Sequence, residues 1–385
     1  MLLIKNGHIK PMVGEELENG CVLINDLGKI EAVAACIQAP EGAEVIDAGG
    51  RLVTPGCVEA HCHIGLDNEA IGWEGHDYNE AADPLTPQMR AVDSINPQDE
   101  AFGLALRGGV TSACTGPGSA NVVGGSFAAI KLSGKRVDKM IIKSPLAMKC
   151  AFGENPKRCY GKDSKKSPVT RMGVAALLRE LLMKTKNYLA DKEEGKNPAY
   201  DAKLEAMIPV IRREIPLKAH AHRADDILTA VRIAKEFDVK LTLDHCTDGE
   251  VIADELAEEG FPAFVGPSLG GKSKVELQHK SFRTPAVLHK AGVPISIITD
   301  APVIPLQFLP MCAGLAASEG LEMEEAWRAI TINPARQTGI ADRVGSLEPG
   351  KDGDVVIWTA DPLTTIGGKA YMTIVEGKIV CGAPD

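Results

Sequence analysis

Two histidines one residue apart follow an apolar stretch near the start of the chain. His61 and His63 close the segment RLVTPGCVEAHCH, residues 51–63, whose apolar run is typical of a buried strand. Side chains two apart on a strand point to the same side, so Cys62 points the other way, into packing. Two neutral imidazoles placed like this can bind one divalent metal ion. Taken alone, a pair of hydrogen-bonded or exposed histidines explains the motif equally well.

Further polar side chains stand at the ends of later apolar segments. His220 ends PLKAH and is followed two residues on by His222, His245 ends VKLTLDH, and Asp300 follows VPISIIT. The carboxyl ends of parallel strands meet at one face of a barrel, so these groups are expected to converge with the first pair on one cavity. The alternatives are a packed histidine at any one position and a helix cap at Asp300.

The elements that would position these residues alternate between strands and helices. Amphipathic helical patterns separate a series of apolar strands, which are Val53–Ala60, Val110–Cys114, Leu146–Phe152, Pro216–Ala219, Lys240–Asp244, Pro262–Val265 and Pro294–Thr299. This order predicts an α/β fold, a parallel (β/α)8 barrel of the TIM type over residues 55–340. For residues 121–144, the sequence allows either one strand or a hairpin.

Both ends of the chain have a different sequence pattern, in which short apolar runs are separated by Gly, Asn or Asp. Such runs are typical of hairpins in antiparallel sheets. We therefore expect residues 1–54 and 341–385 to pair into one small β-sandwich domain.

Two long segments are expected to be loops at the face of the barrel that carries active sites, Leu66–Pro97 and Asn155–Pro168. Between Pro156 and Arg171 there are six Lys or Arg residues and one Asp. This basic stretch favours an anionic small-molecule substrate, although a solvated loop explains it too. The predicted substrate-binding residues in the later loops are Lys272 and Arg171.

Composition excludes several classes of protein. A net charge of −10 argues against nucleic-acid binding, and no apolar run is long enough to cross a membrane. The ten cysteines contain no CxxC pair, so neither a zinc ribbon nor a small disulfide scaffold is indicated. The first twenty residues lack a signal-peptide pattern, and we expect a cytoplasmic enzyme.

Taken together, VTPGCVEAHCH, KAHAHR, LDHCTD and IITDAP resemble the motifs of the amidohydrolase superfamily of metal-dependent hydrolases. The segment TINPARQTGIADRVGSLEPGKDGDVVIW is also similar to that family's passage out of the barrel. The resemblance covers nearly the whole chain and is nearest to the imidazolonepropionase-like and dipeptidase-like branch. It also implies that the protein can form homo-oligomers.

The resemblance implies a set of metal ligands, which are His61, His63, His220 and Asp300, with His245 either binding a second ion or orienting the attacking water. Related motifs place the ligand first in HAHR, so the resemblance makes His222 a substrate-binding residue or a residue behind the ligands. Zinc is the expected metal, as one or two ions, and another divalent first-row ion would fit the same ligand types. A two-metal site would need a bridging carboxylate. Glu154 at the end of its strand is favoured, with a carboxylated Lys149 as its rival.

The implied reaction is hydrolysis of an amide-like C–N bond, in a cyclic amide, an N-acyl amino acid or a dipeptide. A metal-activated water attacks, Asp300 transfers the proton, and the metal or His245 polarises the carbonyl. The alternative is a deaminase acting on a small heterocycle, although HAHR lacks the acidic residue of the deaminase form. A P-loop nucleotide-binding protein is a further alternative, because Gly266–Ser273 matches GxxxxGKS, but too little chain follows it for a nucleotide domain.

Overall fold

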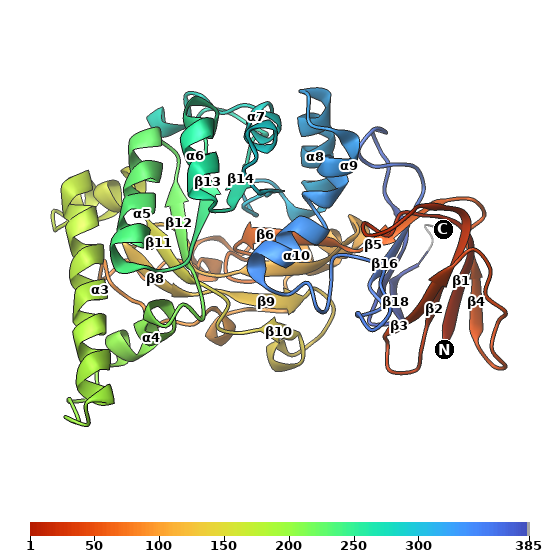
Figure 1. The fold of residues 1–385 in the computed structure, drawn as a ribbon, viewed down its shortest axis with the longest axis horizontal. Helices are drawn as coiled ribbons and strands as arrows, with labels where there is room; N and C mark the ends of the chain where they lie inside the picture. Colours follow the sequence, from red (N-terminus) through yellow and green to blue (C-terminus); the bar gives the residue numbers. More distant parts are fainter. Residues whose placement is uncertain (383–385) are drawn as a thin grey trace.

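Strands from both ends of the chain form one sheet in the computed structural model, which describes residues 1–382. Its order is β18-β17-β16-β5-β1-β2-β3, with β4 also paired to β1. The strands are β1 (Leu2–Ile9), β2 (Leu17–Ile24), β3 (Ile30–Ala34), β4 (Glu44–Asp47), β5 (Leu52–Pro55), β16 (Val355–Trp358), β17 (Ala370–Val375) and β18 (Lys378–Cys381). Strand β5 joins the two ends, since it is parallel to β1 and antiparallel to β16 (Figure 1).

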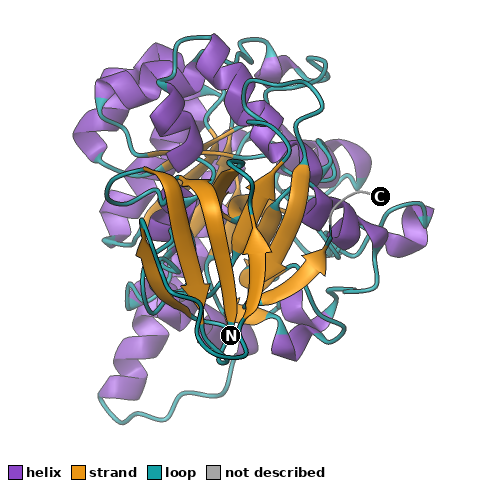
Figure 2. Ribbon diagram, turned by 90° about the vertical axis from the view of Figure 1, so that its right-hand side faces the viewer, coloured by secondary structure: helices purple, strands orange, loops and turns teal. Residues whose placement is uncertain are grey.

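The predicted two-sheet sandwich is not confirmed, because these eight strands belong to one hydrogen-bonded sheet. One of its apolar clusters joins residues of both chain ends, including Ile4, Val22 and Ile357. Figure 2 shows this sheet facing the viewer with helices behind it. The domain boundaries given above stay a prediction.

The central strands fall into two further sheets. One has the order β10-β9-β7-β6 and the other β15-β14-β13-β12-β11-β8. They comprise β6 (Cys57–Cys62), β7 (Val110–Thr115), β8 (Val123–Ser126), β9 (Ala128–Lys131), β10 (Ile141–Lys143), β11 (Met148–Ala151), β12 (Leu217–Ala221), β13 (Leu241–His245), β14 (Ala263–Val265) and β15 (Ile295–Ile297). Strands β11 to β15 are parallel, as the sequence predicts.

The segment that contains β8, β9 and β10 departs from the parallel pattern. Only Phe127 separates β8 from β9, so one nearly continuous segment runs antiparallel to β11 in one sheet and to β7 in the other. Strand β10 then pairs with β9 as a hairpin. Gly125 has φ +126, and a Cβ there would lie 2.5 Å from the carbonyl oxygen of Met89, so the first long loop packs directly on this segment.

The described residues do not form a closed hydrogen-bonded ring of strands, because β15 and β6 belong to different sheets. The gap between them is bridged by the two residues that follow helix α9 (Met323–Arg328). Val58 N donates to Ile330 O and Ile297 N donates to Ala329 O, at 2.8 and 2.9 Å. The carboxylate of Glu59 also crosses the gap, accepting from the backbone N and Oγ1 of Thr299 at 2.9 and 2.7 Å.

Helices pack around the central strands. They are α1 (Glu100–Arg107), α2 (Glu154–Pro156), α3 (Arg171–Glu193), α4 (Ala202–Ile211), α5 (Ala224–Phe237), α6 (Ala253–Glu259), α7 (Thr284–Ala291), α8 (Leu309–Ser318), α9 (Met323–Arg328) and α10 (Ile332–Thr338), and a π-helix (Lys157–Asp163) follows α2. Helix α5 buries Ile227, Val231 and Ala234, the apolar stripe that its sequence predicts. Within residues 1–382, no helix has the length and apolar character needed to span a membrane.

Candidate metal centre

The predicted histidines and Asp300 meet at the carboxyl ends of the central strands. His61 belongs to β6, His220 to β12 and His245 to β13, while Asp300 lies three residues after β15. The ring of His245 is 5.3 Å from that of His61 and 4.5 Å from that of His220, centroid to centroid. Residues far apart in sequence therefore form one cluster, as the strand-end pattern predicts.

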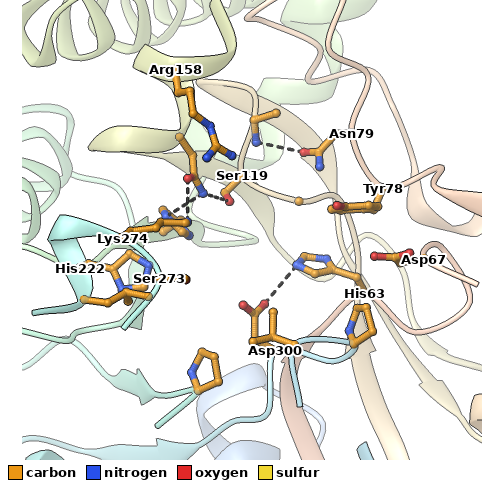
Figure 3. Close-up of a pocket in the computed structure, with 18 of the residues that line it drawn as sticks. His63, Asp67, Tyr78, Asn79, Ser119, Arg158, His222, Ser273, Lys274 and Asp300 are labelled. Atoms are coloured by element: carbon orange, nitrogen blue, oxygen red, sulfur yellow. Dashed lines mark hydrogen bonds and ion pairs between the residues drawn. The ribbon is translucent and has the colours of Figure 1, made fainter. Parts of the chain in front are cut away.

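One part of the cluster surrounds a carboxylate oxygen. Oδ1 of Asp300 lies 3.2 Å from Nε2 of His61 and 3.2 Å from Nε2 of His63 (Figure 3 shows the second pair). This oxygen is buried and has no hydrogen-bond partner within the described chain. An orphaned carboxylate oxygen between two imidazole nitrogens has the composition of a divalent metal site, so the residues present fit the ion that the sequence predicts.

The second part is a group of three histidines. The ring centroids of His220, His222 and His245 lie 4.5 to 4.7 Å from one another. Their ring nitrogens are close enough to hold an ion, and His245 also belongs to a ligand group with His61 and Asp300. His222, predicted to contact substrate, thus stands among the candidate ligands.

Hydrogen bonds fix which nitrogen of these rings faces inward. Nδ1 of His63 is 2.7 Å from the carbonyl oxygen of Gly116, and Nδ1 of His245 is 2.8 Å from that of Gly266. A carbonyl only accepts, so each Nδ1 carries the proton and each Nε2 keeps a free lone pair. Metal-binding histidines are usually oriented in this way.

Burial keeps the imidazoles neutral. It lowers the pKa of His61 and holds the pKa values of His220, His222 and His245 well below the usual range. Burial alone would raise the pKa of Asp300, but the neighbouring rings of His61 and His63 hold that pKa well below its usual range. Neutral imidazoles beside an ionised carboxylate are the protonation states that a metal ion requires.

Two of these residues have an unusual backbone. His245 has φ +78 and Asp300 has φ +54, in the region that L residues rarely adopt. Such a conformation costs on the order of 1–3 kcal/mol and persists where the surroundings over-determine it, which is common at functional sites.

A buried ionic cluster forms the floor below the rings. Asp244 accepts from Nζ of Lys218 at 2.8 Å and from Nζ of Lys149 at 3.1 Å, and its Oδ2 is 3.1 Å from Nδ1 of His61. Lys149 also lies 3.5 Å from Nε2 of His61. These side chains are 0 to 2% exposed, so the two lysines place positive charge directly beneath the ligands.

Glu59 fixes the first strand against the last. It is fully buried and accepts from the backbone N of His61 at 2.9 Å as well as from Thr299. Burial raises the pKa of Glu59 to about 7. This residue positions β6 and the turn before Asp300.

The two rival bridging residues lie in different places. Lys149 stands in β11 with its ammonium facing the cluster, whereas Glu154 starts α2 after the chain has turned at Gly153, and its backbone N donates to Glu276 Oε2 at 3.0 Å. The structure brings Lys149, and not Glu154, into contact with the described histidines.

A cavity of about 840 Å³ opens above the histidines. Both segments predicted as long loops line it, with Asp67, Tyr78 and Asn79 from the first and Arg158 from the second (Figure 3). The second segment is not a loop over most of its length, because residues 154–163 form α2 and the π-helix. Lys272 lines it too, but Arg171 does not: its guanidinium is bound to Asp226 at 3.0 Å, in a separate depression beside α3 and α5.

Sequence reasoning missed several polar residues around the cavity. Lys274 donates to Asn155 Oδ1 at 2.8 Å, and the amide of Asn155 donates to Ser119 at 2.7 Å. Lys274 and Ser119 lie in loops and Asn155 lies in the three-residue α2, so no periodicity marks them. Lys218 and Asp244 did carry a signal, because a charged residue inside an apolar strand needs a partner.

Comparison with known proteins agrees with this geometry. The model of the amidohydrolase family matches residues 52–380. The chain belongs to the amidohydrolase family. The match includes Gly266–Ser273, so the glycine-rich segment is a loop of this fold rather than part of a nucleotide domain.

Individual relatives cover most of this chain. An amidohydrolase named tasK from Hapsidospora irregularis is 29% identical over 378 residues, which are 91% of this chain but only 38% of that protein. An imidazolonepropionase from Idiomarina loihiensis is 26% identical over 364 residues, 89% of this chain and 86% of that one. The crystal structure of an amidohydrolase from Thermotoga maritima is 43% identical, covers 99% of this chain and 100% of its own, and superimposes with a TM-score of 0.96.

These findings confirm the superfamily and branch that the motifs indicated. The protein is an enzyme, a hydrolase of the amidohydrolase family acting on carbon–nitrogen bonds. Its cluster of His and Asp residues is suited to a divalent metal ion.

Proposed function

We propose that this amidohydrolase cleaves an amide-like C–N bond in a small carboxylate-bearing molecule, namely a cyclic amide, an N-acyl amino acid or a dipeptide. The observation that carries the proposal is the orphaned oxygen of Asp300 between two inward-facing Nε2 atoms, below an open cavity. The proposed ligands are His61, His63, His220, His245 and Asp300. Zinc is the first choice of metal because these are nitrogen and oxygen ligands.

A bound divalent ion would supply a hydroxide nucleophile at neutral pH, because it lowers the pKa of water to about 7. Asp300 would accept the proton of the attacking water and deliver it to the leaving nitrogen. Its pKa, held well below the usual range, keeps Asp300 ionised, which is the form that can accept a proton.

His245 has a narrower role than the sequence alone allowed. Its Nδ1–H is committed to the carbonyl of Gly266, so the neutral ring has no second N–H with which to polarise a substrate carbonyl. Its Nε2 suits metal binding or orientation of the water by accepting a hydrogen bond. We therefore propose that His245 acts on the nucleophile side of the reaction.

Charge on the cavity wall supports an anionic substrate. Arg158, Lys272, Lys274 and Lys280 line the cavity. The ammonium groups of Lys272 and Lys280 are bound to carbonyl oxygens of their own loop rather than to carboxylates. These four cations outnumber the carboxylates of Asp67, Asp163 and Asp300 in the same lining and, on a protein of net charge −10, would attract a substrate carboxylate.

The test is metal removal followed by substrate screening. The chelated enzyme should lose hydrolysis of its substrate and regain it with Zn²⁺, Mn²⁺ or Co²⁺. N-acyl amino acids, dipeptides and cyclic amides would each be assayed as the free acid and as a neutral ester, with the acid expected to have the lower KM. Heterocyclic amidines that release ammonia would test the deaminase alternative.

The variant Asp300→Asn tests the proposed role of Asp300 in proton transfer. Assayed at saturating metal, kcat should fall on the order of 10²–10⁴-fold, because a proton-transfer group has been removed. Undiminished activity of the chelated enzyme, or of a metal-loaded Asp300→Asn variant, would contradict the proposal.

A further inference from the structure

Three polar side chains on the cavity wall are joined by hydrogen bonds. Nζ of Lys274 donates to Oδ1 of Asn155 at 2.8 Å, and Nδ2 of Asn155 donates to Oγ of Ser119 at 2.7 Å. All three residues line the cavity, and Lys274 and Ser119 can be followed in Figure 3. They come from three segments of the chain, which are the loops after β7 and β14 and helix α2.

The direction of these bonds leaves donors available to a ligand. An ammonium only donates, so the oxygen of the Asn155 amide faces Lys274 and its NH2 group faces Ser119. Ser119 therefore accepts, and its own O–H has no acceptor among the described residues. Within residues 1–382, Asn155 is also the one hydrogen-bond acceptor of the Lys274 ammonium, because Oε1 of Glu276 is 3.6 Å away.

The four cations of the cavity wall differ in how they are held. Lys272 and Lys280 are bound to carbonyl oxygens of their own loop, and Arg158 is exposed. The side chain of Lys274 is 23% exposed and is held by side chains. Because partly buried charges are screened less than exposed ones, Lys274 is the cation of this wall that is best placed for a specific ion pair.

The same side chains reach the candidate metal centre. Nδ2 of Asn155 lies 3.4 Å from Nε2 of His220, and the oxygen of Glu276 beside Lys274 lies 3.8 Å from Nε2 of His222. A group bound by Lys274 and Ser119 would therefore stand next to the histidines, close to the bond that is cleaved.

We propose that Lys274 and Ser119 form the subsite that binds the substrate carboxylate, with Asn155 as the positioning residue between them. One carboxylate oxygen accepts from the ammonium and the other from the hydroxyl, and hydrogen bonds to charged groups are the strong ones. This inference rests on the proposed function and narrows its substrates to N-acyl amino acids and dipeptides. In both, the carboxylate is on the carbon bonded to the scissile nitrogen, so it lies close to the cleaved bond.

The experiment compares each free acid with its neutral amide. The full-length, metal-loaded enzyme would be assayed with a panel of N-acetyl amino acids and dipeptides and with the matching C-terminal carboxamides, which lack the negative charge. Wild type should have the higher kcat/KM for the acids. Lys274→Gln should lower kcat/KM for the best acid on the order of 10–100-fold, mainly through KM, because a hydrogen bond between charged groups is lost. Its kcat/KM for the amide should stay within about twofold of wild type, because the amide never made that bond.

Further variants test each part of the subsite. Ser119→Ala should lower the acid-to-amide ratio of kcat/KM by about three- to tenfold, since one hydrogen bond is lost, and Asn155→Ala should lower it without removing any charge. Lys274→Arg keeps the charge and should restore part of the ratio. Lys184→Gln is the matched control, because Lys184 pairs with Glu180 outside the cavity and its loss should leave the ratio unchanged. Circular dichroism and metal content would show that each variant is folded and loaded.

Lys272→Gln separates a defined subsite from general attraction by the cavity wall. If the wall acted only through its summed charge, Lys272→Gln and Lys274→Gln would lower the ratio equally, and this result would overturn the inference. Equal cleavage of acids and amides by wild type, an unchanged ratio in Lys274→Gln, or no cleavage of any acid in the panel would also overturn it. The proposed metal-dependent hydrolysis is judged separately, by chelation and by Asp300→Asn.

Discussion

Two buried lysines lie side by side on neighbouring strands, and they differ in what they face. Lys149 and Lys218 are cross-strand partners on β11 and β12 and share the carboxylate of Asp244. The ammonium of Lys218 lies over the ring of Phe264, at 4.2 Å, whereas that of Lys149 is 3.5 Å from Nε2 of His61. Only Lys149 is therefore positioned to act on the metal centre.

This difference predicts opposite results for the two rival residues. Lys149→Met should lose bound metal and activity, because it removes the amine that a bridging carbamate would need next to His61, whereas Glu154→Gln should retain both. Metal content by elemental analysis and hydrolysis rates would be measured on the same samples. Growth with ¹³C-bicarbonate would reveal a carbamate on Lys149 by NMR. The reverse pattern, with Glu154→Gln losing the metal, would restore Glu154 as the bridging residue.

The sequence located the histidines and Asp300 because strand ends in a parallel fold share one face, and that rule needs no knowledge of loop shape. The choice between Lys149 and Glu154 relied on strand alternation over a longer stretch. Strand β11 stops at Ala151, and Gly153, with φ +81, turns the chain before Glu154. Alternation therefore no longer applied at Glu154. Lys274 and Asn155 could not be found at all, because the segments around them have no periodic pattern.

At the scale of elements, one glycine brings three segments together. Gly153 connects β11 to α2, and a Cβ on it would lie 2.9 Å from Oδ2 of Asp226 on α5 and 2.9 Å from Oε2 of Glu276 after β14. Its φ of +81 with ψ of −138 is open to glycine and strained for other residues. The close approach of two carboxylates depends on the missing side chain.

Gly153→Ala should therefore destabilise the protein and weaken metal binding, because the displaced Glu276 lies 3.8 Å from Nε2 of His222. The backbone strain alone costs on the order of 1–3 kcal/mol, and the methyl group would also displace Glu276. Gly195→Ala is the control, since Gly195 has φ +76 but no atom within 4 Å of its Cβ position. Urea unfolding and Co²⁺ titration would be compared. Equal effects of the two variants on metal binding would show that Gly153 has no special link to the site.

The direction of β8 and β9 illustrates what a pattern of elements cannot specify. Their residues are buried throughout, so a strand of either direction would satisfy the same apolar sequence. The antiparallel arrangement depends on contacts with the first long loop, where Ser126 N donates to Met89 O at 2.9 Å. It places Phe127 between the two sheets, and its ring stacks on His61 with centroids 5.3 Å apart.

At the scale of the whole molecule, a buried ionic cluster connects the central strands to the end sheet. Nζ of Lys131 on β9 lies 2.9 Å from Asp352 and 2.7 Å from Asp354, just before β16, and all three side chains are 1 to 3% exposed. Asp352 also pairs with Arg343 at 2.8 Å and with Lys29. The contact between the two regions thus depends on charges that are shielded from water.

This cluster predicts loss of stability in acid. Burial alone would raise the pKa of Asp352, but Lys131, Lys29 and Arg343 hold it below its usual range. A group whose pKa is depressed by folding stabilises the protein above its unfolded pKa, about 4 for Asp, and this contribution disappears as the pH falls below that value. Urea unfolding from neutral pH down to about pH 3 should show the decline.

Lys131→Met tests whether that decline comes from the cluster. Removing one partner of a buried pair leaves uncompensated charge and costs about 3 kcal/mol, whereas Lys184→Met, which breaks an exposed pair with Glu180, should cost less than about 1 kcal/mol. The Lys131→Met protein should also depend less on pH in the acidic range, because the pKa of Asp352 is depressed less without Lys131. An acid dependence equal to that of wild type would assign the effect to other carboxylates, and the two regions would then be held together chiefly by the β5–β16 pairing.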